Sequence, residues 1–345
     1  MTLSLPMPRT PDPASAPPVR WGILATGWIA SAMAQAMLAH TRQQIVACAS
    51  RSADRSAAFA ERFHVPTAYN SYEALVADPR VEAVYVASPH SEHYVHAKLA
   101  LTAGKHVLVE KAFTQNAAQA RELAELAQLH GVVLMEAMWT RFLPRHDIVR
   151  QLLAAGALGE LETVVADHGQ YMEFDPAGRM YNPDLAGGAL LDLGIYPISF
   201  ARFVLGAPGS VQAQGTLTST GVDRQASVIL DGFPQSSAHA VLTTTLAAKT
   251  PTTAVISGSQ ARIELDGDFY GPGPVRLVSR DGSSATSAPE PIRRHYGLCY
   301  EAAHFASLIR EGQTESPLLP RAETVAIMET LDKIRAHIGV RYPGE

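Results

Sequence analysis

Two polar side chains interrupt an apolar segment of the chain, residues 187–204. Asp192 and Tyr196 lie four residues apart, so on a helix they share one face, and Ser199 continues it. The segment opens with two glycines and is apolar nearly all round, which is typical of a buried helix. A carboxylate and a phenol there are either hydrogen-bonded core groups or a catalytic acid/base facing a cleft. The segment alone leaves both interpretations open.

Composition limits the classes of protein to consider. The chain has 345 residues, 47% of them hydrophobic and 18% charged, which is enough for two domains with separate cores. A net charge of -5 and the lack of Lys/Arg clusters argue against nucleic acid or an anionic membrane as the main partner. The two cysteines, Cys48 and Cys299, have no metal or Cys-x-x-Cys spacing, which fits a reducing cytoplasm. Residues 1–18 are proline-rich without an apolar run, and we expect a flexible tail rather than a signal peptide.

A turn that could bind phosphate follows the first apolar run, residues 19–24. It comprises Thr26, Gly27, Trp28 and Ile29, and a helical pattern comes next. The stretch nearly matches the dinucleotide fingerprint G-x-G-x-x-G/A, with Ala25 at the first glycine position. In that motif, backbone NH groups at a helix N-terminus face a pyrophosphate, and a glycine avoids a collision. An ordinary strand-to-helix turn is the alternative.

Arg51 bears on which dinucleotide would bind. A second apolar strand, residues 45–49, ends at Ser50, Arg51 and Ser52, where an NAD enzyme would carry Asp or Glu for the ribose 2′-hydroxyl. A guanidinium instead matches a 2′-phosphate, and Arg55 lies nearby. We therefore expect NADP rather than NAD; the alternative is an arginine in a solvated turn.

Alternating strands and helices continue to residue 109. A helix at 52–63, a strand at 83–87, a helix at 93–103 and a strand at 106–109 indicate a parallel, doubly wound sheet, whose ligands bind at the carboxyl ends of the strands. One such end carries Ser88, His90 and His93, which we expect near the cofactor. His90, His93 and His96 lack a fourth ligand of matching spacing, so we expect no metal. Another end carries Glu110 and Lys111; this lysine is either solvated or the partner of the Tyr196 helix.

Three stretches together carry a family resemblance. They are Glu110-Lys111-Ala112, the sequence Met-Glu-Ala-Met-Trp-Thr-Arg-Phe at 135–142, and residues 187–196. In combination, and over the whole chain from Val19, the sequence resembles the glucose-fructose oxidoreductase/inositol dehydrogenase (Gfo/Idh/MocA) family. The resemblance is strongest to the branch of dimeric dihydrodiol dehydrogenases and NADP-dependent sugar dehydrogenases. Ala112 replaces a proline usual in the family, and without it the preceding residue is less restrained; Ala25 is a second departure.

The resemblance implies that Lys111 and Tyr196 are a catalytic pair. A free tyrosine titrates near about 10, so a base near neutrality needs help from a nearby cation. Tyr196 would then take the proton of a substrate hydroxyl as hydride leaves for NADP, with Asp192 orienting the substrate or Lys111. The implied activity is an NADP-dependent dehydrogenase acting on an aldose, an anhydrosugar or a cyclic vicinal diol. An enzyme with tightly bound cofactor that performs sugar-sugar oxidoreduction or glycoside cleavage by transient oxidation is an alternative, as is a non-catalytic NADP-sensing regulator.

The remainder of the chain predicts a second, α+β domain. A helix at 145–158, a long strand at 161–172 and short apolar segments between 211 and 279 indicate a large, mostly antiparallel sheet with one face covered by helices. The resemblance implies that the other face forms a homodimer interface. The predicted domains are 19–140 for NADP binding and 141–345 for substrate binding and dimerisation. With Glu110 and Lys111, we expect Trp139 and Arg141 to bind the cofactor, although these last two could instead join the domains. Trp139, Arg179 and Tyr171 are candidate substrate contacts beside Asp192 and Tyr196, although loop surface is the default for Arg179.

Overall fold

The computed structural model describes residues 4–345, which form two compact units. Residues 11–142 and 294–325 make up the parallel-sheet unit, and residues 4–10, 143–293 and 326–345 make up the mixed-sheet unit. The predicted second domain therefore differs from the observed unit, because residues 294–325 belong with the parallel sheet.

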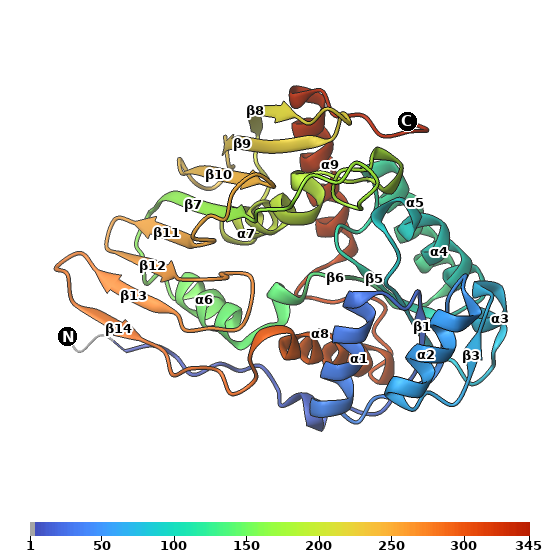
Figure 1. The fold of residues 1–345 in the computed structure, drawn as a ribbon. Helices are drawn as coiled ribbons and strands as arrows, with labels where there is room; N and C mark the ends of the chain where they lie inside the picture. Colours follow the sequence, from blue (N-terminus) through green and yellow to red (C-terminus); the bar gives the residue numbers. More distant parts are fainter. Residues whose placement is uncertain (1–3) are drawn as a thin grey trace. The chain divides into compact units, whose positions relative to one another are not determined.

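The parallel-sheet unit has the doubly wound architecture that the sequence predicted. Its six strands run in the order β3-β2-β1-β4-β5-β6, all parallel. Helices α4 and α5 lie side by side against one face, and α1 and α8 lie together against the other (Figure 1). The elements are η1 (Pro13–Ser15), β1 (Arg20–Leu24), α1 (Trp28–His40), β2 (Gln44–Ala49), α2 (Ala53–Phe63), β3 (Ala68–Tyr69), α3 (Tyr72–Ala77), β4 (Ala83–Val86), α4 (His90–Thr102), β5 (His106–Glu110), α5 (Ala117–His130), β6 (Leu134–Ala137), η2 (Trp139–Phe142), η5 (Arg294–Gly297) and α8 (Leu298–Arg310).

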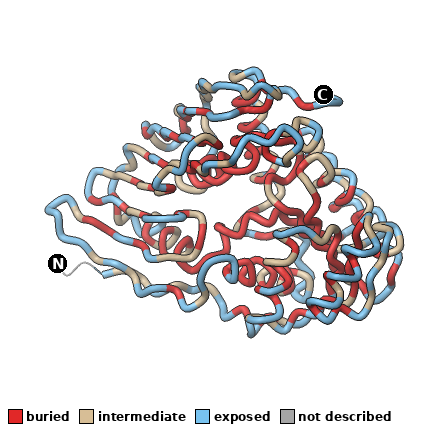
Figure 2. The backbone as a smooth tube through the Cα atoms, in the orientation of Figure 1, coloured by how far each residue is buried: buried red, intermediate tan, exposed pale blue. Residues whose placement is uncertain are grey.

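Helix α8 completes the core of this unit. The ring of Phe305 lies 5.2 Å from that of Trp21 on β1, and both side chains are fully buried. Figure 2 shows the same concentration of buried residues along the strands and α8. Burying two such aromatic side chains contributes several kcal/mol on the scale of about 25 cal/mol per Å². Residues 294–325 are thus part of this core although they are distant in sequence.

The mixed-sheet unit is built on eight strands in the order β14-β13-β12-β11-β7-β10-β9-β8. All neighbours are antiparallel except β7 and β10, which confirms the predicted mostly antiparallel sheet. Along β10 buried and exposed residues alternate, because one face contacts helices and the other does not. The elements are α6 (Pro144–Ala154), β7 (Leu161–Gly169), η3 (Pro183–Leu185), η4 (Leu190–Gly194), α7 (Ile195–Leu205), β8 (Ser210–Leu217), β9 (Asp223–Asp231), β10 (His239–Thr245), β11 (Ala254–Gly258), β12 (Ala261–Leu265), β13 (Arg276–Ser279) and β14 (Ser284–Thr286); α9 (Arg321–Ile338) begins in the parallel-sheet unit and ends here.

The central apolar helix is buried as predicted but is not a single α-helix. Its first turn, Leu190–Gly194, is π-helical, and α7 follows from Ile195 to Leu205. Within the described part of the chain, one stretch, Pro183–Leu205, is long and apolar enough to cross a membrane. Inside the protein, 89% of its apolar window is buried, as in a core helix.

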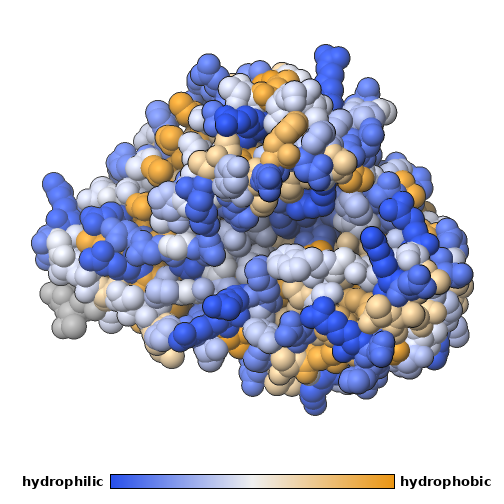
Figure 3. Space-filling model, in the orientation of Figure 1, coloured by the Kyte–Doolittle hydropathy of each residue, from blue (hydrophilic) through white to orange (hydrophobic). Residues whose placement is uncertain are grey.

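The proline-rich start of the chain has contacts that the prediction of a flexible tail did not include. Arg42 Nη2 donates to Ser15 O at 3.0 Å and Gln43 Nε2 donates to Pro17 O at 2.9 Å. In the mixed-sheet unit, Gln151 Nε2 donates to Met7 O at 2.9 Å. From residue 7 onward the tail is therefore bound along the two units. The face of the protein drawn in Figure 3 is mostly hydrophilic, with apolar residues in scattered patches.

Candidate active site

The turn after β1 leaves an open, uncapped helix N-terminus. Ala25 adopts a left-handed conformation at φ 71°, as a glycine would. Gly27 caps α1 at φ −76° without a side-chain hydrogen bond, and no heavy atom lies within 4 Å of where its Cβ would stand. Neither backbone conformation nor packing therefore requires glycine at 27. The buried hydroxyl of Thr26 also has no hydrogen-bond partner among the described residues. The open space at Gly27, the backbone NH groups at the start of α1 and the hydroxyl of Thr26 could together bind a diphosphate.

The loop after β2, the strand that pairs with β1, carries the exposed side chain of Arg51. Burial raises the pKa of the neighbouring Tyr72, and the positive charge of Arg51 partly offsets this increase. Ser52 Oγ accepts from Arg55 N at 3.4 Å and so caps α2, while Ser50 is buried and its Oγ accepts from Ser52 N at 3.3 Å. Of the four predicted ligands here, the two arginines are exposed and the two serines have hydrogen bonds within the loop.

At the end of β4 the histidines are buried. His93 is fully buried, and its Nδ1 and Nε2 lie 2.9 Å from Ala112 O and 2.8 Å from Ser88 O. Burial lowers the pKa of His93 to about 4, although the two carbonyl oxygens favour the protonated ring. Its ring therefore joins the ends of β4 and β5, and its predicted contact with the cofactor stays a prediction. His90 is 4% exposed and lies edge-on to His93.

The end of β5 carries Lys111 and the first of three buried carboxyl groups, Glu110. Lys111 is half-buried, its N donates to Glu110 Oε2 at 3.2 Å, and the Lys111–Ala112 peptide is cis. Tyr85 donates to the other oxygen of Glu110. Glu136 and Glu301 are also buried; burial raises the pKa of Glu136 to about 7 and that of Glu301 well above its usual range, with Glu110 adding to both. Burial and the neighbouring carboxyl groups therefore both oppose the ionisation of Glu301.

Trp139 and Arg141 each have a partner within the parallel-sheet unit. Arg141 Nη2 lies 3.5 Å from Glu323 Oε1, and this ion pair lies within one unit. The ring of Trp139 stacks on His295 at 5.7 Å, and His295 lies edge-on to the exposed Trp28 at 4.9 Å. His295 was not among the residues predicted from the sequence. Two tryptophans of the candidate cofactor site are thus joined by one imidazole.

In the mixed-sheet unit, a buried carboxylate holds the start of the helix that carries Asp192 and Tyr196. Asp223, the first residue of β9, accepts from Leu190 N at 2.6 Å. A Cβ on Gly188, which has φ 114°, would lie 2.1 Å from Asp223 Oδ1. Tyr342 Oη donates to Gly187 O at 2.7 Å. Gly188 is therefore required by the close approach of Asp223, whereas a Cβ on Gly187 would lie 2.7 Å from the carbonyl oxygens of Arg179 and Met180.

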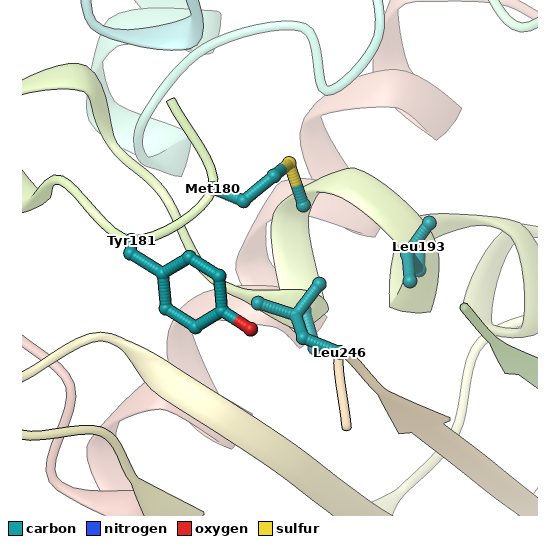
Figure 4. Close-up of a cluster of buried hydrophobic side chains, with 5 residues drawn as sticks. Met180, Tyr181, Leu193 and Leu246 are labelled. Carbon is teal, nitrogen blue, oxygen red and sulfur yellow. The ribbon is translucent and has the colours of Figure 1, made fainter. Parts of the chain in front are cut away.

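Asp192 is paired with a loop residue that the sequence also singled out. Arg179 donates to both carboxylate oxygens, at 3.0 Å and 3.3 Å. The next residues, Met180 and Tyr181, anchor this loop in an apolar cluster with Leu193 and Leu246 (Figure 4). The loop therefore holds Arg179 against the helix, whereas Tyr171 is 69% exposed.

Tyr196 lies in an aromatic group of this unit. It is 7% exposed, and its ring stacks on Tyr270 at 4.5 Å and lies 5.4 Å from His168. His168 Nδ1 lies 3.2 Å from Leu193 O and its Nε2 lies 3.0 Å from Gln170 Nε2. Because a carbonyl only accepts and an amide NH₂ donates, this arrangement fits a neutral ring protonated at Nδ1.

The predicted catalytic residues belong to both units. Lys111 is in the parallel-sheet unit, and Asp192 and Tyr196 are in the mixed-sheet unit, so their proximity stays a prediction. Among residues 4–345, no group of three or more His, Cys, Asp or Glu side chains is arranged to hold a metal ion.

The parallel sheet and its open turn define the class of protein. Residues 19–138 match the model of an oxidoreductase family with an NAD-binding Rossmann fold, and residues 146–264 match the GFO/IDH/MocA C-terminal domain. The chain belongs to the GFO/IDH/MocA family of oxidoreductases, which confirms the resemblance seen in the sequence.

Named relatives cover nearly the whole chain. D-xylose 1-dehydrogenase (NADP(+)) of Hypocrea jecorina is 38% identical, over 94% of this chain and 93% of the relative. Trans-1,2-dihydrobenzene-1,2-diol dehydrogenase of Mus musculus is 37% identical, over 94% and 98%. The 3-ketoreductase KijD10 of Actinomadura kijaniata, solved with NADP and TDP-benzene, is 27% identical with a TM-score of 0.80, over 93% and 98%. Along nearly its whole length the chain is thus similar to dehydrogenases and a ketoreductase, and it is itself an oxidoreductase.

Proposed function

We propose that the enzyme oxidises a hydroxyl group of a sugar or a cyclic vicinal diol with NADP, using Tyr196 as acid/base and Lys111 as its assisting cation. The observation that carries the proposal is the environment of Tyr196: a phenol on a buried helix, stacked in an aromatic group, one turn from the Asp192–Arg179 ion pair. The named activities of the D-xylose and dihydrodiol relatives support the substrate class.

The cofactor selectivity follows from the parallel-sheet unit. Backbone NH groups of the turn from Thr26 to Ile29 would hold the diphosphate, and the exposed Arg51 would pair with the 2′-phosphate. When bound, NADP supplies the hydride acceptor. The NADP named for the relatives supports this selectivity over NAD.

The chain's own groups would handle the proton. Tyr196 as phenolate accepts the proton of the substrate hydroxyl, and the ammonium group of Lys111 stabilises that phenolate. One oxygen of Asp192 accepts from a second substrate hydroxyl while the hydrogen bonds from Arg179 hold the carboxylate in place. The same pair serves carbonyl reduction in the reverse direction.

The test of the acid/base role is Tyr196→Phe, assayed by absorbance of reduced nicotinamide with D-xylose, other aldoses, anhydrosugars and cyclic diols. We expect kcat to fall at least a hundredfold while the NADP affinity is retained, since general acid/base catalysis contributes about 10²–10⁴-fold. Full turnover with an unchanged pH profile would refute the role of Tyr196.

A second test addresses the cofactor. Arg51→Ala should weaken NADP binding at least tenfold more than NAD binding, because only NADP carries the 2′-phosphate. The matched control is Arg55→Ala, which removes an exposed arginine four residues away on α2. Equal losses for the two nucleotides would exclude the phosphate contact.

We also propose a homodimer through the open face of the mixed sheet. Val241 is 41% exposed and aligns with Val165 on β7 and Ile229 on β9, which are 47% and 41% exposed. This row of apolar side chains across three strands fits a partner surface. Val241→Lys should shift the mass found by sedimentation from dimer to monomer; a wild-type monomer would refute the proposal.

Two free, buried cysteines suit the reducing cytoplasm that we propose as the location.

A further inference from the structure

A loop between β12 and β13 contacts the helix of Tyr196 through two adjacent aromatic residues. Tyr270 stacks on Tyr196 at 4.5 Å with 29° between the rings, and Phe269 meets Phe200 edge-on at 5.5 Å. Tyr196 and Phe200 are four residues apart on α7, so they lie on successive turns of one face. The loop therefore holds two turns of the helix at once.

The same tyrosine also contacts the strand beneath the helix. Tyr270 stacks on His168 of β7 at 4.6 Å, with 25° between the rings. Offset stacking of this kind stabilises a relative ring orientation as well as burying apolar surface. Tyr270 thus joins the candidate acid/base to the central strand of its sheet.

A buried arginine fixes the loop on both sides of Tyr270. Arg145 of α6 is 1% exposed, and its guanidinium donates to Asp268 O at 3.3 Å, Gly271 O at 2.9 Å and Pro274 O at 2.8 Å. Glu290 Oε1 accepts from both Arg145 N and Gly273 N, at 3.1 Å and 3.3 Å. A Cβ on Gly273 would lie 2.9 Å from Arg145 Nη1, so glycine is needed for this approach.

The burial of this guanidinium is unfavourable and calls for a reason. Burial lowers the pKa of Arg145 to about 10 and raises that of Glu290 to about 7. A surface loop of ten residues can be closed by backbone hydrogen bonds and turns without a buried cation. In this loop, Arg145 fixes the conformation of residues 268–274 and therefore the position of the Tyr270 ring.

We propose that Tyr270 is a positioning residue for Tyr196: its ring fixes the plane of the phenol, and Arg145 fixes the ring. This inference rests on the proposed function of Tyr196. A tilt of the phenol ring moves its oxygen, and a rotation of the ring plane turns the lone pairs of that oxygen, so a ring free to do either would spend less time aligned with the substrate hydroxyl. Proton transfer is sensitive to such alignment.

The experiment is a double-mutant cycle in steady-state kinetics. Tyr270→Leu should lower kcat about tenfold with KM for NADP unchanged, and Tyr270→Phe, which keeps the ring, should restore kcat to within about twofold of wild type. In a Tyr196→Phe background, Tyr270→Leu should change the residual rate less than twofold, because no acid/base remains to be oriented. Arg145→Gln should reproduce part of the loss in the wild-type background alone.

The control variant is Tyr94→Leu, which removes a half-buried tyrosine of α4, in the parallel-sheet unit, whose hydroxyl bonds Glu122. It should leave kcat unchanged. Equal losses from Tyr270→Leu in both backgrounds would mean that Tyr270 only supports the fold, and this would overturn the inference. A Tyr270→Leu enzyme with wild-type kcat beside an inactive Tyr196→Phe enzyme would also overturn it while leaving the proposed function intact. Full turnover of Tyr196→Phe would overturn both.

Discussion

Replacing Asp223 by asparagine should change how stability depends on pH. Burial raises the pKa of Asp223 from 3.8 to about 6, and this outweighs its hydrogen bond from Leu190 N. Because the folded-state pKa is raised, the folded protein binds the proton more tightly. The stabilisation is therefore fully present below about pH 4 and is lost as pH rises to about 6. The pKa change corresponds to about 3 kcal/mol.

The assay is thermal and urea unfolding of wild type and Asp223→Asn at pH 4.5 and pH 7. The neutral amide does not titrate, so the wild-type advantage over the variant should shrink by about 2 kcal/mol between the two pH values. For a unit of this size that is a change of roughly 4–8 °C in the difference between melting temperatures. Asp184→Asn, an exposed carboxylate of the same unit, is the control.

Parallel pH curves for wild type and Asp223→Asn would show that burial does not raise the pKa of this carboxyl group. A wild-type advantage that grows with pH would mean that the ionised carboxylate at the helix N-terminus stabilises the fold more than burial penalises it. Either result would refute the reasoning.

Three glycine-related substitutions give further predictions. Gly27→Val should lower NADPH affinity at least tenfold by fluorescence titration while the melting temperature changes little, since its side chain meets no heavy atom within 4 Å; unchanged affinity would contradict the cofactor site. Gly188→Ala should destabilise the protein by at least about 2 kcal/mol, because φ is 114° and the new Cβ would collide with Asp223. Ala25→Gly removes about 1 kcal/mol of left-handed strain but adds similar freedom to the unfolded chain, so the measured stability should change by less than about 1 kcal/mol.

Local patterns predicted the parallel-sheet unit well. Strands β4 and β5 begin at the predicted residues, Ala83 and His106, because apolar runs between helical patterns are a local signal. The turn at Gly27 and the cation at Arg51 follow from fixed spacings along the same unit. Boundaries were less accurate: β7 ends at Gly169 rather than at residue 172, and α4 begins at His90 rather than His93.

Long-range partnerships were not predictable. The carbonyl groups that Arg145 binds are 123 to 129 residues further along the chain, and Asp223 caps a helix 33 residues before it. No local periodicity encodes such pairs, so Arg145, Asp223, Tyr270 and His168 were missed. The one available signal was an arginine at the start of a predicted helix, and an arginine at such a position usually lies on the surface.

The assignment of residues 294–325 to the parallel-sheet unit has a consequence for synthesis and engineering. The polypeptide passes between the two units after residues 10, 142, 293 and 325, so neither unit is a continuous segment. On the ribosome, the nucleotide-binding half cannot finish its core until Phe305 emerges, by which time most of the other half has been made. Exchange of the cofactor-binding half with that of a relative would require two separate inserts, and truncation at residue 142 would leave Trp21 without its partner.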